Sequence, residues 1–318
     1  MKLIKHPHGS GHVSQDTVNE FEDIIVRDEQ VSIISVAAFK IFLSKIFVKL
    51  VSKKILQVPK SLFQKRNEKL FCIMLGDEFH KSALSFLTNK NNNTYFFDAW
   101  PNNHKIIETF IKNFKVKKVF FSSQQVTEIF HNKGLDCNFF WIPEAVNTEN
   151  YLFKPYSEKD IDVLSFGRKY SLLHDRIVEG LKISNINYLY EKTPGQIVFN
   201  SREDFIDGLS RTKISICIPS NITHPERSGD ISTMTVRYLQ SMASKCLILG
   251  YIPLDMQNLF DYNPIIEIDM DNPLKQIKDI LNNFETYLPL IEKNYAYIME
   301  NHSWTHRWLM VKDIINKV

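Results

Sequence analysis

The sequence predicts an α/β fold with two open, mostly parallel sheets, each covered by helices on both faces. Strand-like apolar runs alternate with helix-length amphipathic segments along the whole chain, and this rhythm is interrupted once, near the middle. Parallel strands need crossover connections, so the alternation is typical of parallel sheets between two layers of helices. With 318 residues, 44% of them hydrophobic, the chain is long enough for two compact domains.

Six strand candidates lie in the first half of the chain. A helix after the first strand is indicated by Val18, Phe21 and Ile25, which recur at helical spacing, with Ser14 as a candidate N-cap. A second, longer helix is expected over residues 39–56, and the asparagine-rich residues 89–93 are expected to form a turn. The strands are expected at MKLIK, VSIISVA, LFCIMLG, TYFFDAW, KVFFSS and NFFWIP.

A polar segment with prolines near both ends, residues 141–160, separates the two halves. We place a domain boundary inside it, between residues 155 and 156, because such segments connect domains. The strands of the second half are expected at IDVLSFG, INYLYE, KISICIPS, CLILG and PIIEI, and only helices are expected after about residue 273.

Composition excludes several classes of protein. The net charge of only +3 argues against nucleic acid as a partner. The four cysteines form no CxxC pair, which argues against a zinc site or a disulfide framework and favours a reducing compartment. No signal-peptide core and no apolar run of about eighteen residues is present, so a cytoplasmic protein is expected, soluble or peripheral on the inner face of a membrane.

The segment HPHGSGH, residues 6–12, forms the turn after the first predicted strand. Ligands of open α/β sheets bind beyond the carboxyl ends of the strands, so a loop lining a cleft is the favoured interpretation. Gly9 and Gly11 would let the backbone approach an acceptor closely. A plain flexible turn and a metal site are the alternatives; three histidines without a carboxylate make the metal site the weaker of these.

Residues 228–250, SGDISTMTVRYLQSMASKCLILG, predict a glycine-containing loop, a helix and a strand. If the helix begins near Thr233, capped by Ser232 or Asp230, then Thr233, Arg237, Gln240 and Ser244 share one polar stripe, while Val236, Leu239, Met242 and Ala243 face the sheet. The amides of Ser228 and Gly229, the helix N-terminus and Arg237 would suit a diphosphate. The alternative is a surface helix with an incidental arginine.

Together with FFDAW, WIPEAVN and HSWTHRW, this block resembles the GT-B glycosyltransferases, and within them the family-4-like group that includes the CgeB-type proteins. The resemblance implies two Rossmann-like domains facing across a cleft, with a nucleotide-sugar in the C-terminal domain and an acceptor against the N-terminal one. It also implies that the last helix, residues 303–318, crosses back to the first domain. The domains would then comprise residues 1–155 with 303–318, and residues 156–302.

The resemblance carries one departure. Gln240 stands where the resembled group usually has a glutamate that binds the ribose hydroxyls. The glutamine oxygen can still accept a hydrogen bond, but it lacks the negative charge that would strengthen that bond. We expect weaker donor binding, and a catalytically weak or inactive member is the alternative function. The residues expected to bind the donor are Gly167, Arg168, Lys169, Ser228, Gly229, Thr233, Thr235, Arg237 and Gln240.

Of these, Gly167, Arg168 and Lys169 form the turn after the first strand of the second half, where donor phosphates would lie in a GT-B enzyme. An exposed basic pair at a helix start is the equal alternative. In the first half, Asp98 ends a buried strand, and a carboxylate there is costly unless it is bonded or functional. A general base, if one is needed, would come from Asp98, His8 or His12, with Asp77 and Glu78 on the acceptor side; helix capping is the commoner role of strand-end acids such as Asp77 and Asp98.

Residues 39–69 form a basic segment with a single acid, Glu68, among residues 40–69. Lys45, Lys49 and Lys53 form one stripe of the expected helix, and Phe39, Phe42, Ile46 and Leu50 lie along another face. A basic amphipathic helix with aromatic residues can bind an anionic membrane surface, which would bring the domain to a lipid-linked acceptor. A core-facing helix with solvated lysines is the alternative.

We therefore expect a glycosyltransferase that moves a sugar from a nucleoside-diphosphate donor to an acceptor hydroxyl, in the synthesis of cell-surface polysaccharide, glycolipid or glycoconjugate. Retention at the anomeric carbon is favoured over inversion, since it is common in the resembled group. No cofactor is expected, and cations and amides would replace a metal at the leaving diphosphate. A nicotinamide-dependent dehydrogenase would need a GxGxxG turn, which neither GSGH nor FGRKY supplies.

Overall fold

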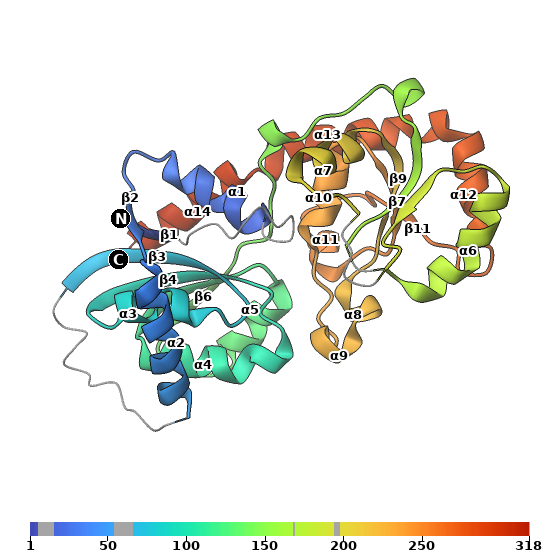
Figure 1. The fold of residues 1–318 in the computed structure, drawn as a ribbon. Coiled ribbons are helices and arrows are strands. Elements are labelled where there is room, and N and C mark those ends of the chain that lie inside the picture. Colours follow the sequence, from blue (N-terminus) through green and yellow to red (C-terminus); the bar gives the residue numbers. More distant parts are fainter. Residues whose placement is uncertain (6–15, 54–65, 168, 194–197, 318) are drawn as a thin grey trace.

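The computed structural model describes residues 1–5, 16–53, 66–167, 169–193 and 198–317, and these form two lobes, each around its own parallel sheet (Figure 1). In the described part of the chain, no helix is both long and apolar enough to cross a bilayer.

The first sheet has six parallel strands in the order β2-β1-β3-β4-β5-β6. Alternate residues of its strands face two helical layers, because successive side chains of a strand point to opposite faces. Leu3 and Phe71 pack toward α1, whereas Ile4 and Cys72 pack toward the layer of α2 to α5. The strands are β1 (Lys2–Lys5), β2 (Ser32–Ser35), β3 (Arg66–Leu75), β4 (Asn89–Phe97), β5 (Val116–Phe121) and β6 (Asn138–Trp141), and the helices are α1 (Asp16–Val26), α2 (Ala38–Ser52), α3 (Ala83–Phe86), α4 (His104–Asn113) and α5 (Gln124–His131).

The second sheet has five parallel strands in the order β11-β10-β9-β7-β8. Helices α7, α10 and α11 cover one face, and α6 and α12 cover the other. The strands are β7 (Ile161–Ser165), β8 (Tyr188–Tyr190), β9 (Thr212–Cys217), β10 (Leu247–Gly250) and β11 (Ile266–Glu267), and the helices are α6 (Ser171–Ile183), α7 (Arg202–Ser210), α8 (Ser220–Thr223), α9 (Pro225–Ser228), α10 (Val236–Ala243), α11 (Leu254–Leu259), α12 (Pro273–Asn282) and α13 (Leu288–Asn301). The chain then continues into α14 (Trp304–Asn316).

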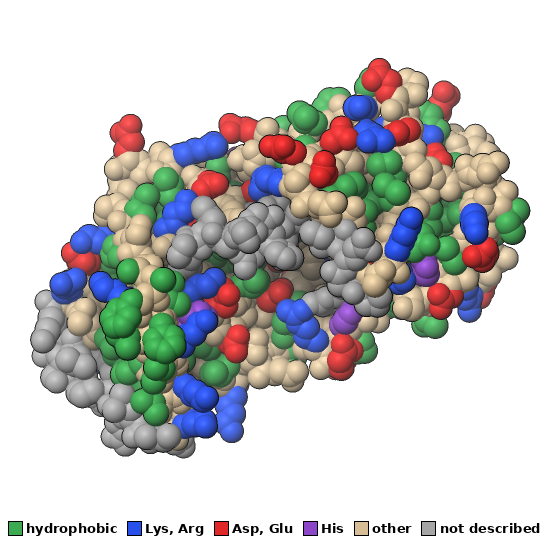
Figure 2. All heavy atoms as spheres, viewed as in Figure 1, with side chains coloured by type: hydrophobic (Ala, Val, Ile, Leu, Met, Phe, Trp, Pro, Cys, Tyr) green, Lys and Arg blue, Asp and Glu red, His purple; other side chains and the backbone are tan. Residues whose placement is uncertain are grey.

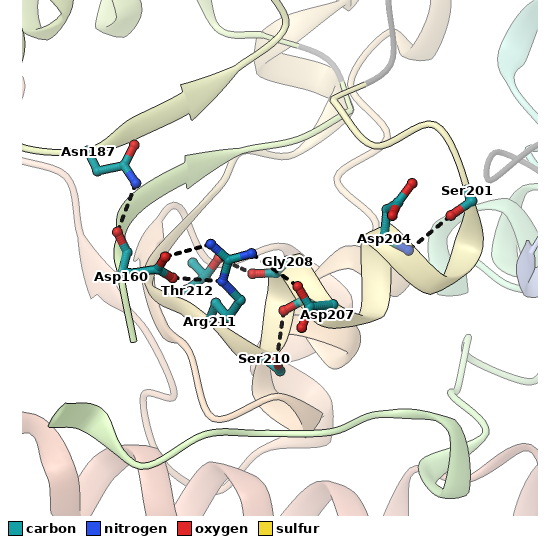
Figure 3. Close-up of polar contacts among 9 residues, drawn as sticks. All are labelled: Asp160, Asn187, Ser201, Asp204, Asp207, Gly208, Ser210, Arg211 and Thr212. Carbon is teal, nitrogen blue, oxygen red and sulfur yellow. Dashed lines mark hydrogen bonds and ion pairs between the residues drawn. The ribbon is translucent and has the colours of Figure 1, made fainter. Parts of the chain in front are cut away.

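Helix α7 is anchored at both ends (Figure 3). At its start, the Ser201 hydroxyl accepts a hydrogen bond of 3.0 Å from the Asp204 amide, a usual N-cap. At its end, the Arg211 guanidinium forms ion pairs with Asp160 at 2.5 Å and with Asp207 at 3.1 Å (Figure 3). These contacts hold the helix beside the start of β7.

The last helix, α14, crosses back to the first lobe and lies beside α1, as expected (Figure 1). Trp304 is fully buried and stacks on Phe21 with ring centroids 4.4 Å apart. Backbone bonds join the two segments: the Val146 amide donates to His302 at 3.2 Å, and the Trp304 amide donates to Val146 at 3.0 Å. The motifs WIPEAVN and HSWTHRW, distant in sequence, are therefore paired side by side.

Candidate functional site

A cavity of about 310 Å³ lies between the two lobes, at the carboxyl ends of strands from both sheets. Open α/β sheets bind their ligands at this edge, because loops and helix N-termini gather there. The exposed surface of the walls is mainly apolar, with polar and charged side chains among the aromatic and aliphatic ones, as in most small-molecule sites. The lining residues are Thr17, Leu75, Phe97, Asp98, Trp100, Glu144, Phe166, Gly167, Val198, Phe199, Phe205, Ser220, Thr235, Val236, Arg237 and Gln240.

Arg237 provides a guanidinium at the cavity wall on the second lobe. It donates hydrogen bonds to the carbonyls of Phe166 at 3.1 Å and Ile218 at 3.3 Å, and these bonds fix the orientation of the planar guanidinium. Gly167 has a φ of +75°, and a Cβ there would lie 3.2 Å from the Arg237 side chain. Glycine is thus favoured at this turn, because other residues rarely adopt this φ and because a Cβ would press on the Arg237 side chain.

Helix α10 begins at Val236, three residues later than the expected start at Thr233. The reason lies in the other lobe: Glu144, just beyond β6, accepts a hydrogen bond of 2.5 Å from the Val236 amide through its carboxyl oxygen. The helix N-terminus is therefore capped across the cleft. Thr235 precedes the helix and lines the cavity, and its buried hydroxyl has no partner among the described residues.

Two carboxyl groups line the cavity, those of Asp98 and Glu144, counting only the part of the chain that is described. Burial, with the neighbouring carboxyls of Asp98 and Asp255, raises the pKa of Glu144 to about 8, against the lowering effects of the Val236 amide and Arg237. Burial also raises the pKa of Asp98, while the adjacent Arg227 opposes the shift. Glu144 is thus mainly a neutral acid at pH 7, when no ligand is bound.

Asp98 forms an ion pair across the cleft with Arg227 of α9, at 3.0 Å. The Arg227 guanidinium also lies 5.5 Å from the ring centroid of Trp100. Asp98 adopts a φ of +50°, uncommon for a residue other than glycine. Arg227 thus brings a charged side chain of the second lobe into contact with the first lobe.

Gln240 lines the cavity but is held by the first lobe and the interlobe segment. Its side-chain amide donates to the Tyr151 hydroxyl at 2.9 Å, and that hydroxyl donates to Glu20 at 3.0 Å. Glu20 is buried, accepts a bond of 2.8 Å from the Asn147 amide, and pairs with Arg202 of α7 at 2.6 Å. Burial raises the pKa of Glu20, and these partners oppose the shift. Gln240 therefore belongs to a network that ties the lobes together.

Three expected donor-binding residues of the loop before α10 lie elsewhere. The amides of Ser228 and Gly229 donate to the carbonyls of His224 and Pro225, at 3.1 Å and 2.8 Å, so helix α9 uses the groups that were expected to face phosphate. The Thr233 hydroxyl donates to Asp255, away from the main cavity. The expected stripe from Thr233 to Ser244 is thus wrong at its first position, because Thr233 is outside the helix.

Lys169 does not line the cavity. Its ammonium lies 5.7 Å from the ring centroid of Tyr190 and 3.5 Å from the Glu191 carbonyl, at the end of β8. On the first lobe, Asp77 is exposed, Glu78 pairs with Lys81, and neither lines the cavity. The remaining predicted residues, His8, Gly9, Gly11, His12 and Arg168, lie outside the described residues.

The sequence reasoning missed Glu144 and Tyr151. Glu144 follows the apolar run NFFWIP, so the rule that singled out Asp98, a carboxylate at the end of a buried strand, would have found it. Tyr151 carries no comparable signal, because its role depends on two partners distant in sequence. Groups of three or more metal-ligating side chains are absent from the described ranges.

No family model and no curated protein matches the sequence. Among solved structures, that of HepE from Anabaena in complex with UDP and glucose is similar at a TM-score of 0.64, with 9% identity and 100% of both chains covered. A sucrose-phosphate synthase from Thermosynechococcus elongatus has a TM-score of 0.60 and 10% identity, over 98% of this chain and 97% of that one. A glycosyltransferase from Rickettsia africae has a TM-score of 0.57 and 14% identity, over 99% and 97%.

The similarity to these structures extends over nearly the whole chain. It agrees with the architecture described above, which has two parallel sheets, a cavity between the lobes and a last helix that returns to the first lobe. The narrower CgeB-type grouping stays a prediction. The chain has the two-domain GT-B fold of glycosyltransferases.

Proposed function

We propose that this protein transfers a glycosyl unit from a nucleoside-diphosphate sugar to an acceptor hydroxyl. The observation that carries the proposal is the Arg237 guanidinium, which is oriented by two carbonyls at the wall of the interlobe cavity. A planar, always charged fork suits the two oxygens of a phosphate. The similarity to HepE, whose structure holds UDP and glucose, supports a nucleotide-sugar as the donor.

We propose that the transfer needs no metal. Negative charge develops on the leaving diphosphate as the glycosidic bond breaks, and a preoriented cation stabilises that charge. Arg237 supplies one, and the N-terminus of α10, whose first amide is engaged by Glu144, adds a partial positive charge beside it. Full transfer activity after treatment with a chelator is the expected result.

We propose retention at the anomeric carbon. Inversion would need a general base beside the acceptor hydroxyl. Of the two carboxyls among the described cavity residues, Asp98 is paired with Arg227, and Glu144 is mainly protonated at pH 7. Neither is suited to accept a proton. An NMR assignment of the product anomer tests this, and a product inverted relative to the donor would contradict it.

The acceptor side, in this proposal, is formed by residues 1–155 with 303–318, and the donor side by residues 156–302. The acceptor is a carbohydrate or a lipid-linked molecule of cell-surface polysaccharide, glycolipid or glycoconjugate synthesis. A lipid-linked acceptor would require the protein to lie on the inner face of a membrane, and helix α2 of the first lobe is the segment we propose for that contact.

A second candidate is a GT-B protein that binds a nucleotide-sugar with little or no turnover. It is favoured by Gln240, whose amide is engaged by Tyr151 and which lacks the charge of the family's glutamate. Donor binding without transfer or donor hydrolysis would support this candidate over the first.

The deciding experiment is a thermal-shift screen with UDP, GDP, CMP and dTDP, followed by calorimetry and by donor turnover with the corresponding sugars. A ligand that binds only the folded protein raises the melting temperature. Arg237→Ala should weaken nucleotide binding by about tenfold or more, since a charge-assisted bond contributes roughly 1.5–3 kcal/mol. Lys169→Ala, which removes a cation outside the cavity, is the matched control. Equal affinities in the two variants would overturn the proposal.

A further inference from the structure

Helix α2 exposes a group of large apolar side chains on the first lobe. The exposed fractions are 69% for Phe39, 61% for Phe42, 41% for Leu43 and 46% for Ile46. These four residues, called the α2 apolar patch below, lie within an arc of about 100° of the helix, at roughly 100° per residue. Contiguous exposed patches of this kind mark interaction sites, whereas single exposed apolar residues are ordinary.

The patch is separate from the face that packs into the lobe. Ser44 and Val51 are buried, and Phe47 and Val48 pack against the core beneath α4, with the Phe47 and Phe114 rings 6.1 Å apart at their centroids. Helix α2 therefore has two apolar faces. The expected core-facing helix accounts for one of them and leaves the α2 apolar patch without a partner in the described chain.

Lysines border the patch on both sides. Residues 38–53 contain four lysines and no acid, and Lys40, Lys45 and Lys53 are exposed. At the same rotation per residue, Lys45 lies on one side of the patch and Lys40 on the other, and Lys53 lies in line with the patch, about two turns further along the helix. Figure 2 shows the apolar side chains of this region with Lys and Arg side chains beside them.

We propose that the α2 apolar patch and its lysines bind an anionic membrane surface. The aromatic and aliphatic side chains would enter the boundary between headgroups and acyl chains, and the ammonium groups would meet lipid phosphates. Long lysine side chains suit this position, because their stems lie along apolar surface while their charge stays at the headgroups.

A second copy of the chain is the competing occupant. In a two-fold dimer the same surface of each copy meets, so the lysines of two patches would lie against each other with no acid on the helix to pair them. Such like-charge contact opposes association, whereas an anionic bilayer complements it. The charge pattern therefore favours lipid.

The experiment is sedimentation of the full chain with vesicles of phosphatidylcholine, alone or with about one-third phosphatidylglycerol. Binding to the anionic vesicles is expected, with a marked decrease at high salt, because salt screens the lysines. The double variants Phe39→Ser/Phe42→Ser and Lys40→Glu/Lys45→Glu should each weaken partitioning by about tenfold or more. No donor is needed, so the result is independent of the proposed transferase activity.

Matched controls carry the same substitutions elsewhere. Ile183→Ser/Leu309→Ser removes apolar side chains that are 80% and 57% exposed, and Lys182→Glu/Lys105→Glu reverses two exposed charges. Both should bind as the unaltered protein does, and all four variants should keep its melting temperature because the residues are exposed. Equal binding to neutral vesicles, or equal losses in the controls, would overturn the proposal. So would a dimer in light scattering that Phe39→Ser/Phe42→Ser dissociates, combined with no vesicle binding.

Discussion

The side-chain amide of Gln240 donates a hydrogen bond of 2.9 Å to the hydroxyl of Tyr151. That hydroxyl in turn donates to the buried Glu20, which pairs with Arg202 of the second lobe. A glutamine at position 240 can donate to Tyr151, whereas an ionised glutamate cannot. Gln240 thus has a structural use in this chain: it completes a contact between the lobes.

Gln240→Glu should destabilise the protein without improving nucleotide binding. The change removes the donor to Tyr151 and brings a second carboxylate toward Glu20, which we expect to lower the free energy of unfolding by about 1–3 kcal/mol. Urea unfolding and calorimetry with UDP measure the two effects. In a Tyr151→Phe background the penalty should be smaller, because the shared hydroxyl is gone. Tighter binding with unchanged stability would show that position 240 serves the donor instead.

Arg202→Ala should destabilise the protein more than Arg211→Ala, although the two arginines flank the same helix. Arg202 compensates the buried Glu20 carboxylate, whose exposed fraction is 1%, and removing it should cost about 2–3 kcal/mol after allowance for its own partial exposure. Arg211 pairs with two exposed aspartates, so its loss should cost under about 1 kcal/mol. Equal losses in urea unfolding would mean that the interlobe pair contributes no more than a surface pair.

Glu144 should make stability fall as pH rises. Its pKa is raised from 4.5 to about 8 in the folded protein, so the folded state binds more protons than the unfolded state between these values. The free energy of unfolding should therefore decrease from about pH 4.5 to pH 8, on the order of 4 kcal/mol in total.

Glu144→Gln, which keeps the shape without the titration, should remove most of that decrease. Urea midpoints measured between about pH 5 and pH 9 test this. Asp77→Asn, at an exposed carboxyl, is the control and should leave the slope unchanged. Burial also raises the pKa of Asp98 and Glu20, so a shallower slope should remain in Glu144→Gln; an undiminished slope would show that Glu144 does not contribute.

Gly167→Ala should weaken nucleotide binding, whereas Gly134→Ala should not. Both glycines have positive φ, +75° and +61°, so alanine should cost roughly 1 kcal/mol of stability at each. Only at Gly167 would the new Cβ meet the Arg237 side chain, at 3.2 Å; at Gly134 nothing lies within 4 Å. Calorimetry with UDP measures the affinity of each variant. Equal affinities would show that the position of Arg237 does not affect nucleotide binding.

The order of strands and helices was predictable from the sequence because it depends on local periodicity. Every expected strand is present, and β11 is the shortest. Residues 89–93 are the exception: their asparagines indicated a turn, but they begin β4. The Asn92 side chain donates to the carbonyls of Phe86 and Phe114 at 3.0 Å and 2.9 Å, which makes a buried strand of polar residues stable.

The composition of the site was predictable only in part. Asp98, Gly167, Thr235, Arg237 and Gln240 were expected and line the cavity. The start of α10 was misplaced because its cap, Glu144, comes from the other lobe, and no local pattern around Val236 contains that information. Ser228 and Gly229 were misjudged for a related reason, since the short helix α9 already uses their amides.

The sequence by itself determined the two sheets and their covering helices, because apolar periodicity specifies which face of each element is buried. The return of the last helix was expected only from the resemblance to the GT-B glycosyltransferases. The tertiary structure alone decided which polar groups meet across the lobes: Gln240 with Tyr151, Glu144 with Val236, and Asp98 with Arg227. Hydrogen bonds and ion pairs act over about 3 Å. Which residues distant in the chain pair with each other is therefore determined only by how the two lobes pack together.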